Sequence, residues 1–458
     1  MAAKGAAFGI RHLLKKAGEN FAWAKPRGRV RRRKGQPNGR ECQRGLPRLE
    51  KAAKTLLAQR RPGVIIETNP PAGGDPMKFF HLSDLHLGKR LCGFSLIDDQ
   101  SYILNQILQL VDSHHPDALL LAGDLYDKPV PPVEAVALLD HFLEELAGRG
   151  LPTLLISGNH DSPQRLAFGA RLLYPSGIHM APVYTGRVEP VVLRDSHGPV
   201  YCYLLPYLKP AHLRQAFPQA QVESYTDAMQ VAIQALSLDP AARNLLVTHQ
   251  FVTGSLRSES EELSVGGADN VDAAVFDPFD YVALGHLHTP QQVGRPTLRY
   301  SGSPLAYSFS EANSPKSVAV VELGEKGQAQ VSTLPLRPRR PLRELTGSYD
   351  WFTLLETYQN VPWREDYLRL VLTDPQEIPD AAARLRVIYP NLMQLAYRRP
   401  EGEGLEPFSL VELPHQSPLE LFGEFYARQN GQPMDARQEQ FVKQLMEEIW
   451  EGEQSCGR

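Results

Sequence analysis

The chain has 458 residues, of which 42% are hydrophobic and 22% charged, the composition of a globular protein with material for two or three domains. No run approaches the roughly 18 apolar residues of a transmembrane helix, which excludes a membrane span. The four cysteines form no C-x-x-C pair, which excludes a disulfide scaffold and a zinc knuckle and suits a reducing, cytoplasmic compartment. The net charge of −3 conceals a division, because residues 1–76 carry 18 basic and 5 acidic side chains (+13) and the remainder carries 31 and 47 (−16).

Residues 1–76 form a basic segment with an Arg/Lys run at 29–34, followed by a Pro/Gly/Asn-rich stretch. It lacks the apolar centre of a secretory signal. One interpretation is a basic arm that holds nucleic acid electrostatically. The other is a disordered leader, or upstream sequence included by a wrongly assigned start. We favour the second interpretation, because Met77 leads directly into the first strand pattern at 79–82.

From Met77 onward, short continuous apolar runs alternate with amphipathic stretches. Such runs are typical of buried strands. Helical spacing between the first and second runs, and between the second and third, predicts two intervening helices, so the pattern is that of an α/β domain. The five predicted strands are 79–82, Ala118–Ala122, Thr153–Ile156, 245–247 and 281–284.

The composition changes at 335–345, where Pro and Arg residues predict a linker. A small α+β unit follows, and two helices end the chain. Ser417 is the expected N-cap of the first of these helices, with Pro418 and Glu420 after it, and Asp435 with Gln438 caps the second. The small unit is predicted as strand Tyr367–Leu372, helix Ala381–Ile388 and strand Leu392–Tyr397. The expected parts of the chain are a leader (1–76), an α/β domain (77–338), a small domain (339–405) and C-terminal helices (406–458).

Each of the five predicted strands is followed by residue types that can bind metals. Ligands and substrates of open α/β sheets collect at the carboxyl ends of the strands, so these side chains should converge. Residues at i and i+2 of an extended segment also point the same way. The candidate ligands are Asp84, His86, Asp124, Asn159, His249, His286 and His288.

This donor set contains oxygen and nitrogen but no sulfur, which suits Mn²⁺, Fe²⁺ or Zn²⁺. Seven ligands are too many for one tetrahedral ion and about right for two ions that share a carboxylate. His160, beside a candidate ligand, is the candidate catalytic residue: it would protonate a leaving oxygen or hold a phosphate oxygen. The remaining histidines are interpreted as surface or hydrogen-bonded residues: His114, His115, His141, His179, His197, His212 and His415.

At these positions the sequence resembles the calcineurin-like metallophosphoesterases, whose pattern is D-x-H, G-D, G-N-H-[DE], H and G-H-x-H. Longer segments resemble the SbcD-type exonuclease subunits of bacteria, which belong to the double-strand-break repair nucleases. The resemblance covers about 77–450. Its segments are His-Leu-Ser-Asp-Leu-His-Leu-Gly (81–88), Ala-Gly-Asp-Leu-Tyr-Asp (122–127), Ser-Gly-Asn-His-Asp-Ser (157–162), Tyr-Val-Ala-Leu-Gly-His-Leu-His (281–288) and Arg-Tyr-Ser-Gly-Ser-Pro (299–304).

The resemblance implies a four-layer α/β/β/α sandwich, a small capping domain and C-terminal helices that dock on the ATPase subunit SbcC. It implies that Asp124 bridges two Mn²⁺ ions, and that His160 is catalytic. One ion would be held by Asp84, His86 and His288, the other by Asn159, His249 and His286. Asp127 departs from archaeal and eukaryotic relatives, which often have a second functional histidine there.

The resemblance also implies ATP-dependent 3′→5′ double-strand exonuclease activity and endonuclease cleavage of hairpins or single strands, in DNA repair and recombination. The ATP chemistry would belong to the partner, because this chain has no G-x-x-x-x-G-K-[ST] loop. A homodimer of the nuclease subunit, DNA as substrate, and a bacterial cytoplasmic, nucleoid-associated location are further expectations. The metal core alone does not choose a substrate, so a metallophosphatase or cyclic-nucleotide phosphodiesterase is the alternative, and a non-enzymatic scaffold is a third hypothesis.

Overall fold

The computed structural model describes residues 65–66, 75–256, 258, 270–359, 361–398 and 418–455. Contacts divide the chain into Met1–Arg61 and Pro62–Arg458, and every described residue belongs to the second unit. Among the described helices, none has the length and apolar character needed to span a bilayer.

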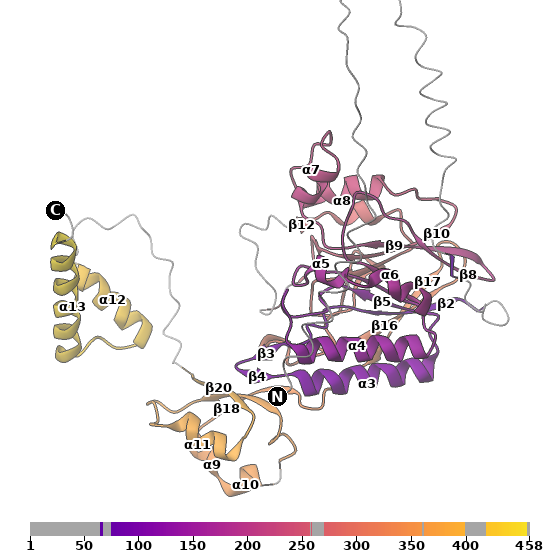
Figure 1. Cartoon of the computed structure of the whole chain (residues 1–458). Helices are drawn as coiled ribbons and strands as arrows, with labels where there is room; N and C mark the ends of the chain where they lie inside the picture. The colour runs from indigo at the N-terminus through magenta and orange to yellow at the C-terminus, as the bar shows by residue number, and fades with distance from the viewer. Residues whose placement is uncertain are drawn as a thin grey trace, which may run out of the picture. The chain divides into compact units, whose positions relative to one another are not determined.

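Two sheets form the centre of the α/β domain (Figure 1). Strands β2, β5, β6 and β7 run parallel to one another in the first sheet, and β9, β10, β13 and β15 do so in the second. The six-stranded sheet has the order β17 (Ala329–Pro335), β16 (Ser317–Leu323), β2 (Met77–Leu82), β5 (Ala118–Ala122), β6 (Thr153–Ile156) and β7 (Ile178–Ala181). The seven-stranded sheet has the order β1 (Ile65–Ile66), β8 (Val191–Asp195), β9 (Gly198–Leu205), β10 (Arg243–His249), β13 (Tyr281–Gly285), β15 (Arg295–Tyr300) and β14 (Gln291–Val293).

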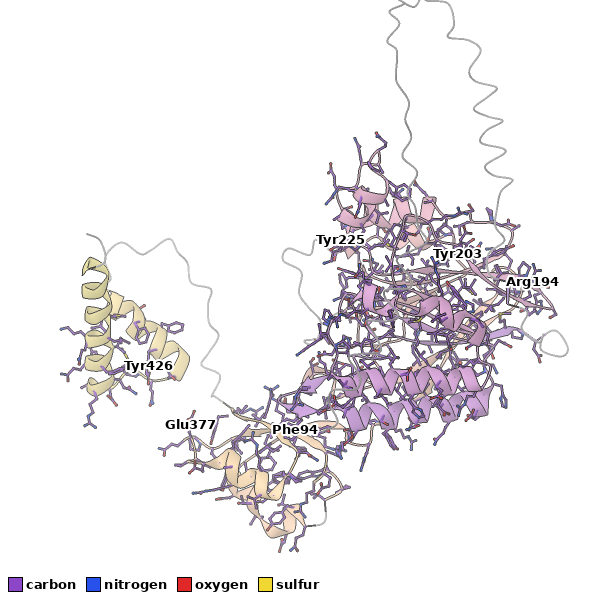
Figure 2. The ribbon with its side chains drawn as sticks, in the orientation of Figure 1. Phe94, Arg194, Tyr203, Tyr225, Glu377 and Tyr426 are labelled. Atoms are coloured by element: carbon purple, nitrogen blue, oxygen red, sulfur yellow. The ribbon has the colours of Figure 1, made fainter. Side chains whose placement is uncertain are left out.

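The sheets pack face to face, and helices cover both outer faces. One buried cluster joins Phe79 and Leu120 of the first sheet to Val247 of the second. Helices α3 (Ile97–His114) and α4 (Val133–Gly148) pack on the outer face of the six-stranded sheet (Figure 1). On the seven-stranded sheet, α7 (Pro210–Ala216) and α8 (Tyr225–Gln234) share a core with Tyr203, which Figure 2 labels. The Tyr203 ring lies 6.2 Å from that of Phe279. The expected α/β/β/α sandwich is thus the observed architecture.

Shorter elements join these layers. The hairpin β3 (Arg90–Leu91) and β4 (Phe94–Ser95) follows the first metal motif, and β11 (Phe251–Val252) pairs with β12 (Asn270–Val271). The short helices are α5 (Pro163–Leu166), α6 (Ala170–Leu173), η1 (Tyr174–Ser176), η3 (Ala273–Phe276) and η4 (Phe309–Glu311).

All five predicted strands are present, and their burial explains their continuous apolar runs. Three of them lie in one sheet and two in the other, so the sites at their ends meet across a sandwich rather than along one sheet. The basic segment 1–76 differs from expectation in one place, because Ile65–Ile66 form β1 and pair with β8. The rest of that segment before residue 75 lies outside the described residues.

The small α+β unit has the predicted elements and one strand that was missed. Strands β19 (Tyr367–Leu372) and β20 (Leu392–Tyr397) and helix α11 (Ala381–Ile388) have the predicted bounds. The predicted linker at 335–345 was too long, because β18 (Leu342–Gly347) begins inside it and pairs with β19. Its adjacent Arg343 and Glu344 are exposed on an edge strand, so the strand resembles the charged linker sequence before it. Helices α9 (Tyr349–Thr353) and α10 (Leu355–Tyr358) complete the unit.

Two helices, α12 (Pro418–Asn430) and α13 (Ala436–Ser455), form the C-terminal part. The predicted cap of α13 is confirmed. The backbone N–H of Asp435 donates to Gln438 Oε1 at 2.9 Å, and the N–H of Gln438 donates to Asp435 Oδ1 at 2.9 Å. The predicted N-cap Ser417 lies outside the described residues.

Candidate metal centre

The candidate ligands sit in turns that follow buried strands, and several of these turns adopt an unusual backbone. Asp84, His86 and Asp124 have φ of 54°, 43° and 50°, and His286 has φ of 108°. Positive φ values are unfavourable for residues other than glycine, and where they persist they tend to lie at functional sites. The Asp84 N–H donates to the carbonyl of Gly123 at 3.0 Å, and the His86 N–H donates to that of Asp124 at 2.9 Å, so the first two turns are tied together.

The structure brings all seven candidate ligands together at one end of the sandwich. On one side, His86 Nε2 and His288 Nε2 are 3.0 Å apart, and both residues group with Asp84 within 4.8 Å. On the other side, Asn159 Oδ1 lies 2.9 Å from His249 Nε2 and 3.0 Å from His286 Nδ1.

Asp124 lies between the two sides. Its Oδ2 is 3.7 Å from His86 Nε2 and 3.3 Å from His249 Nε2. Its side chain is 2% exposed, so water has little access to these oxygen and nitrogen atoms. Buried oxygen and nitrogen atoms that converge in this way suit divalent cations, and the residues therefore fit two ions with a shared carboxylate.

His160 stands at the edge of this cluster and is half-buried, like Asn159, whereas the other six candidate ligands are buried. Its backbone N–H donates to Asp124 Oδ1 at 2.9 Å, and its Nδ1 is 3.1 Å from the carbonyl oxygen of Asp127. Because a carbonyl only accepts, Nδ1 must carry a proton, which leaves Nε2 to gain or lose one. The Asp127 carboxylate itself pairs with Lys89 Nζ at 2.8 Å.

The charges in the cluster depend on one another. Burial raises the pKa of Asp84 to about 6, although nearby His249 and His288 oppose this shift. Burial also opposes ionisation of Asp124, but the adjacent His249 and His86 hold its pKa below the ordinary range. Burial lowers the pKa of His249, but the Asp124 carboxylate raises it more, so that the pKa of His249 is about 9. A bound cation would take the place of these protons.

Asp161, the last residue of the Gly-Asn-His-Asp motif, received no role from the sequence. Its carboxylate accepts hydrogen bonds from the backbone N–H groups of Leu125, Tyr126 and Gly158 at 3.0 to 3.1 Å. It therefore clamps the Asp124 turn to the Asn159 turn. Its place in the motif was the signal that could have identified it.

Three further side chains support the ligands. Gln100 on α3 donates to the carbonyl of His86 at 2.7 Å and accepts from the N–H of Gly88 at 2.9 Å. Glu311 Oε1 lies 3.4 Å from His288 Nδ1, and its Oε2 is 2.6 Å from Lys316 Nζ. Such carboxylate–histidine pairs orient metal ligands. No sequence pattern marks these residues, because they act through tertiary contacts.

The interpretation of the other histidines needs one correction. His179 is 2% exposed, and neither of its ring nitrogens has a hydrogen-bond partner among the described residues. It is therefore neither a surface nor a hydrogen-bonded residue. Its ring packs against Tyr174 with centroids 5.2 Å apart, and burial lowers its pKa. His415 lies outside the described residues.

Comparison with known proteins agrees with this geometry. The calcineurin-like phosphoesterase family matches residues 77–290, and the family described as the type 5 capsule protein repressor C-terminal domain matches residues 338–430. The SbcD subunit of the nuclease SbcCD from Staphylococcus epidermidis is 32% identical over 381 residues, which cover 82% of this chain and 100% of that protein. Its counterpart in Staphylococcus saprophyticus is 30% identical, over 82% of this chain and 99% of that protein. The chain belongs to the SbcD family of metallophosphoesterase-type nuclease subunits.

Proposed function

We propose that this chain is the nuclease subunit of an SbcCD-type complex and hydrolyses DNA phosphodiesters in repair and recombination. The activities proposed are ATP-dependent 3′→5′ exonuclease cleavage of duplex ends and endonuclease cleavage of hairpins and single strands. The observation that carries the proposal is the convergence of seven oxygen and nitrogen ligands beside His160.

The proposed division of roles follows the two sides of the cluster. Asp84, His86 and His288 would hold one cation, and Asp124 would bridge to the second. Two such cations supply a polarised phosphodiester and an activated water. The ligands that hold the second cation in this proposal are Asn159, His249 and His286. We propose Mn²⁺ as the native metal, because the donors are oxygen and nitrogen without sulfur.

His160 is the proposed catalytic residue. Its Nδ1 proton is engaged by the Asp127 carbonyl, which fixes the ring and leaves Nε2 to act on substrate. In its protonated form, Nε2 would donate to the leaving oxygen of the cleaved strand. Once neutral, the ring would regain a proton from the attacking water or from solvent, and so reset for the next cycle.

An SbcC-type ATPase subunit is the proposed partner, and the C-terminal helices are its proposed docking site. Helix α13 exposes 67% of Phe441 and 46% of Leu445, and α12 exposes 54% of Phe425. Exposed aromatic side chains of this size are typical of interfaces. The net charge of −16 beyond residue 76 opposes unaided binding of polyanionic DNA, which favours a partner that supplies much of the grip.

A second copy of the chain is also proposed as a partner. Apolar side chains are exposed near the start of α4 and on α5–α6, and a pocket lined by Val136 and Phe168 shows that these regions adjoin. Val133 is 80% exposed and Phe168 91% exposed. We propose this face as the dimer contact.

We further propose that residues 77–338 form the nuclease domain and residues 339–405 the capping domain. The proposed place of action is the bacterial cytoplasm, at the nucleoid.

The experiment that tests the proposal is cleavage by the reconstituted complex. The chain is copurified with its SbcC-type subunit and assayed on hairpin and duplex DNA with Mn²⁺, with and without ATP. We expect nicking of the hairpin and ATP-dependent shortening of the duplex. Intact DNA combined with turnover of small phosphoesters would contradict the proposal and support the metallophosphatase or cyclic-nucleotide phosphodiesterase alternative.

A further inference from the structure

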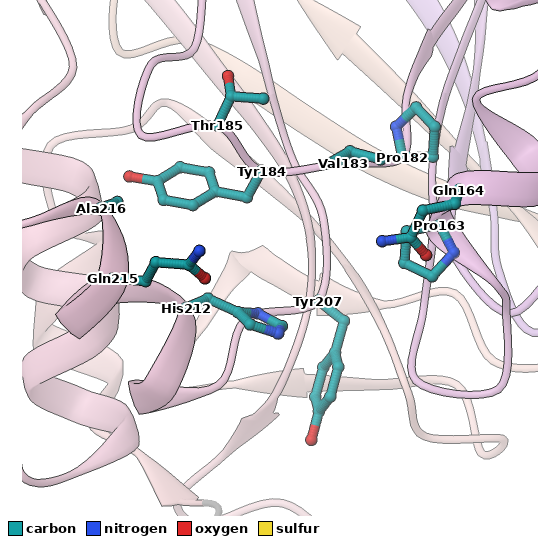
Figure 3. A pocket seen from close by; sticks show the side chains of 10 residues that line it. All are labelled: Pro163, Gln164, Pro182, Val183, Tyr184, Thr185, Tyr207, His212, Gln215 and Ala216. Carbon is teal, nitrogen blue, oxygen red and sulfur yellow. The ribbon is translucent and has the colours of Figure 1, made fainter.

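A cavity of 560 Å³ lies beside the candidate metal centre, and we call it the Tyr184 pocket after one of its aromatic walls. Figure 3 shows Tyr184, His212 and Gln215 on one side of it, Pro163 and Gln164 on the other, and Tyr207 between them. Its volume falls within the range of about 300–1,000 Å³ that is typical of pockets for small organic groups.

The pocket is fixed to the metal centre through Tyr207. The Tyr207 ring lies nearly parallel to that of His286, with centroids 6.5 Å apart, and meets that of His249 edge-on at 6.1 Å. Its backbone N–H donates to the carbonyl of Ser157 at 3.0 Å, just before the Asn159 turn. The opposite wall begins at Pro163, two residues after Asp161. The Tyr207 wall of the pocket therefore adjoins the candidate ligands His249 and His286.

The lining has the chemistry of a site for a planar, uncharged, hydrogen-bonding ring. Tyr184, Tyr207 and His212 offer flat faces for stacking. Gln164 and Gln215 offer amide donors and acceptors at the edges. None of the described lining residues carries a carboxylate, although the chain beyond residue 76 is strongly acidic.

A cation next to two of the lining residues, Tyr207 and His212, completes the match to a nucleotide. Lys209 Nζ lies 5.9 Å from the centre of the Tyr207 ring, and its backbone N–H donates to the His212 ring at 3.3 Å. An ammonium group at this place would attract the phosphate that follows a stacked base.

We propose that the Tyr184 pocket receives the unpaired nucleobase of a nucleotide next to the scissile phosphodiester. The proposal rests on the proposed nuclease function and adds a determinant of substrate choice. A base held in the pocket is withdrawn from its pairing partner. Single strands, hairpin tips and frayed ends would therefore be cut in preference to intact duplex.

The test combines a substrate change with an enzyme change. Single-stranded oligonucleotides with one abasic site, moved along the strand, are cleaved at a fixed bond by the reconstituted Mn²⁺ complex. For the wild type, we expect one position near that bond at which the abasic site lowers kcat/KM roughly 5- to 150-fold. The Tyr184→Ala variant should show a similar loss on the complete strand and little further loss with the abasic site at that position.

Controls separate the pocket from folding and from the chemistry. Tyr184→Phe keeps the flat ring and should retain the abasic position that is sensitive in wild type. Tyr102→Ala removes a tyrosine that is 43% exposed on α3 and should also cleave like wild type. If Tyr184→Ala does not fold, Thr185→Trp at an exposed lining position fills the pocket instead and should reproduce its losses.

The outcomes distinguish this inference from the function on which it rests. The pocket assignment would be wrong if no abasic position lowered cleavage by wild type. It would also be wrong if the abasic site lowered kcat/KM as much in Tyr184→Ala as in wild type. Either result would leave the nuclease function standing. Failure of the wild-type complex to cut any DNA would overturn both.

Discussion

Glu311 and Lys316 show how residues outside every motif contact a candidate metal ligand, His288. The Glu311 carboxylate faces His288 Nδ1, and Lys316 Nζ also donates to the His288 carbonyl at 2.8 Å. The adjacent Lys316 and His288 overcome the effect of burial and hold the pKa of Glu311 below its ordinary range. The carboxylate therefore stays ionised and would orient the His288 ring so that Nε2 could hold a cation.

We predict that Glu311→Gln weakens metal binding by about 10- to 100-fold, because the amide holds the histidine less firmly than a carboxylate. Calorimetric titration of the metal-free chain with Mn²⁺ measures this. The matched control is Glu325→Gln, on an exposed turn far along the chain from the ligands. Wild-type affinity in Glu311→Gln would show that His288 needs no such support.

His81 provides a residue-scale test of pH dependence. It is fully buried between the sheets, with Nδ1 2.9 Å from the Tyr281 hydroxyl, and burial lowers its pKa from 6.5 to about 3. Below pH 6.5 the His81 side chain binds a proton in the unfolded chain but not in the folded chain. The stability contributed by the neutral His81 is therefore fully present above pH 6.5. Below it, the unfolding free energy falls by about 1.4 kcal/mol per pH unit as the pH drops toward 3.

We predict that between about pH 7.5 and about pH 5 the metal-free wild type loses about 2 kcal/mol more unfolding free energy than His81→Phe does. Urea unfolding in a chelator at the two pH values measures the difference. The exposed His141→Phe serves as control and should follow wild type. Parallel losses in wild type and His81→Phe would contradict a buried neutral His81.

At the scale of elements, glycines at the strand ends let the ligand turns approach one another. A Cβ at Gly285 would lie 1.9 Å from the Ala122 carbonyl oxygen and 2.7 Å from His249 Nδ1. Both neighbours belong to the centre, since the Ala122 carbonyl is also 2.8 Å from His249 Nδ1. Nothing flexible is available to move aside.

We predict that Gly285→Ala lowers the unfolding free energy by about 1–3 kcal/mol and reduces the bound metal. Denaturant unfolding and metal analysis check the two effects. Gly148→Ala is the control, because a Cβ there meets no atom within 4 Å and lies in helix α4. If both variants match wild type, the close approach of β13 and β5 is not needed.

The sequence predicted elements better than their assembly. Continuous apolar runs identified all five site strands, because strands buried on both faces need no alternation. The same pattern carries no information on which strands share a sheet, and the two-sheet arrangement came only from the resemblance. Strand β18 escaped notice because its exposed Arg343 and Glu344 resemble a linker. In the site, motifs identified the candidate ligands, whereas Gln100, Glu311 and Lys316 depend on tertiary contacts that sequence spacing does not encode.

For the whole molecule, the question raised by the charge is which part holds DNA. All 18 basic residues of the first 76 lie within 1–61, a unit separate from the one that contains every candidate ligand. We predict that removing 1–61 leaves the DNA KM of the complex and its salt dependence unchanged, because in the proposed complex the SbcC-type partner supplies most of the DNA contacts. KM measured across a salt series tests this. A shallower salt slope after truncation would show that the basic segment contacts phosphates.

The central claim is that Asp124 holds two ions together while His160 acts on the substrate. Metal analysis of purified Asp124→Ala and His160→Ala tests it most directly. We predict two ions per chain in wild type and in His160→Ala, which should nevertheless fail to cleave DNA, and loss of both ions in Asp124→Ala. Equal metal loss in the two variants, or full metal content in Asp124→Ala, would contradict the account.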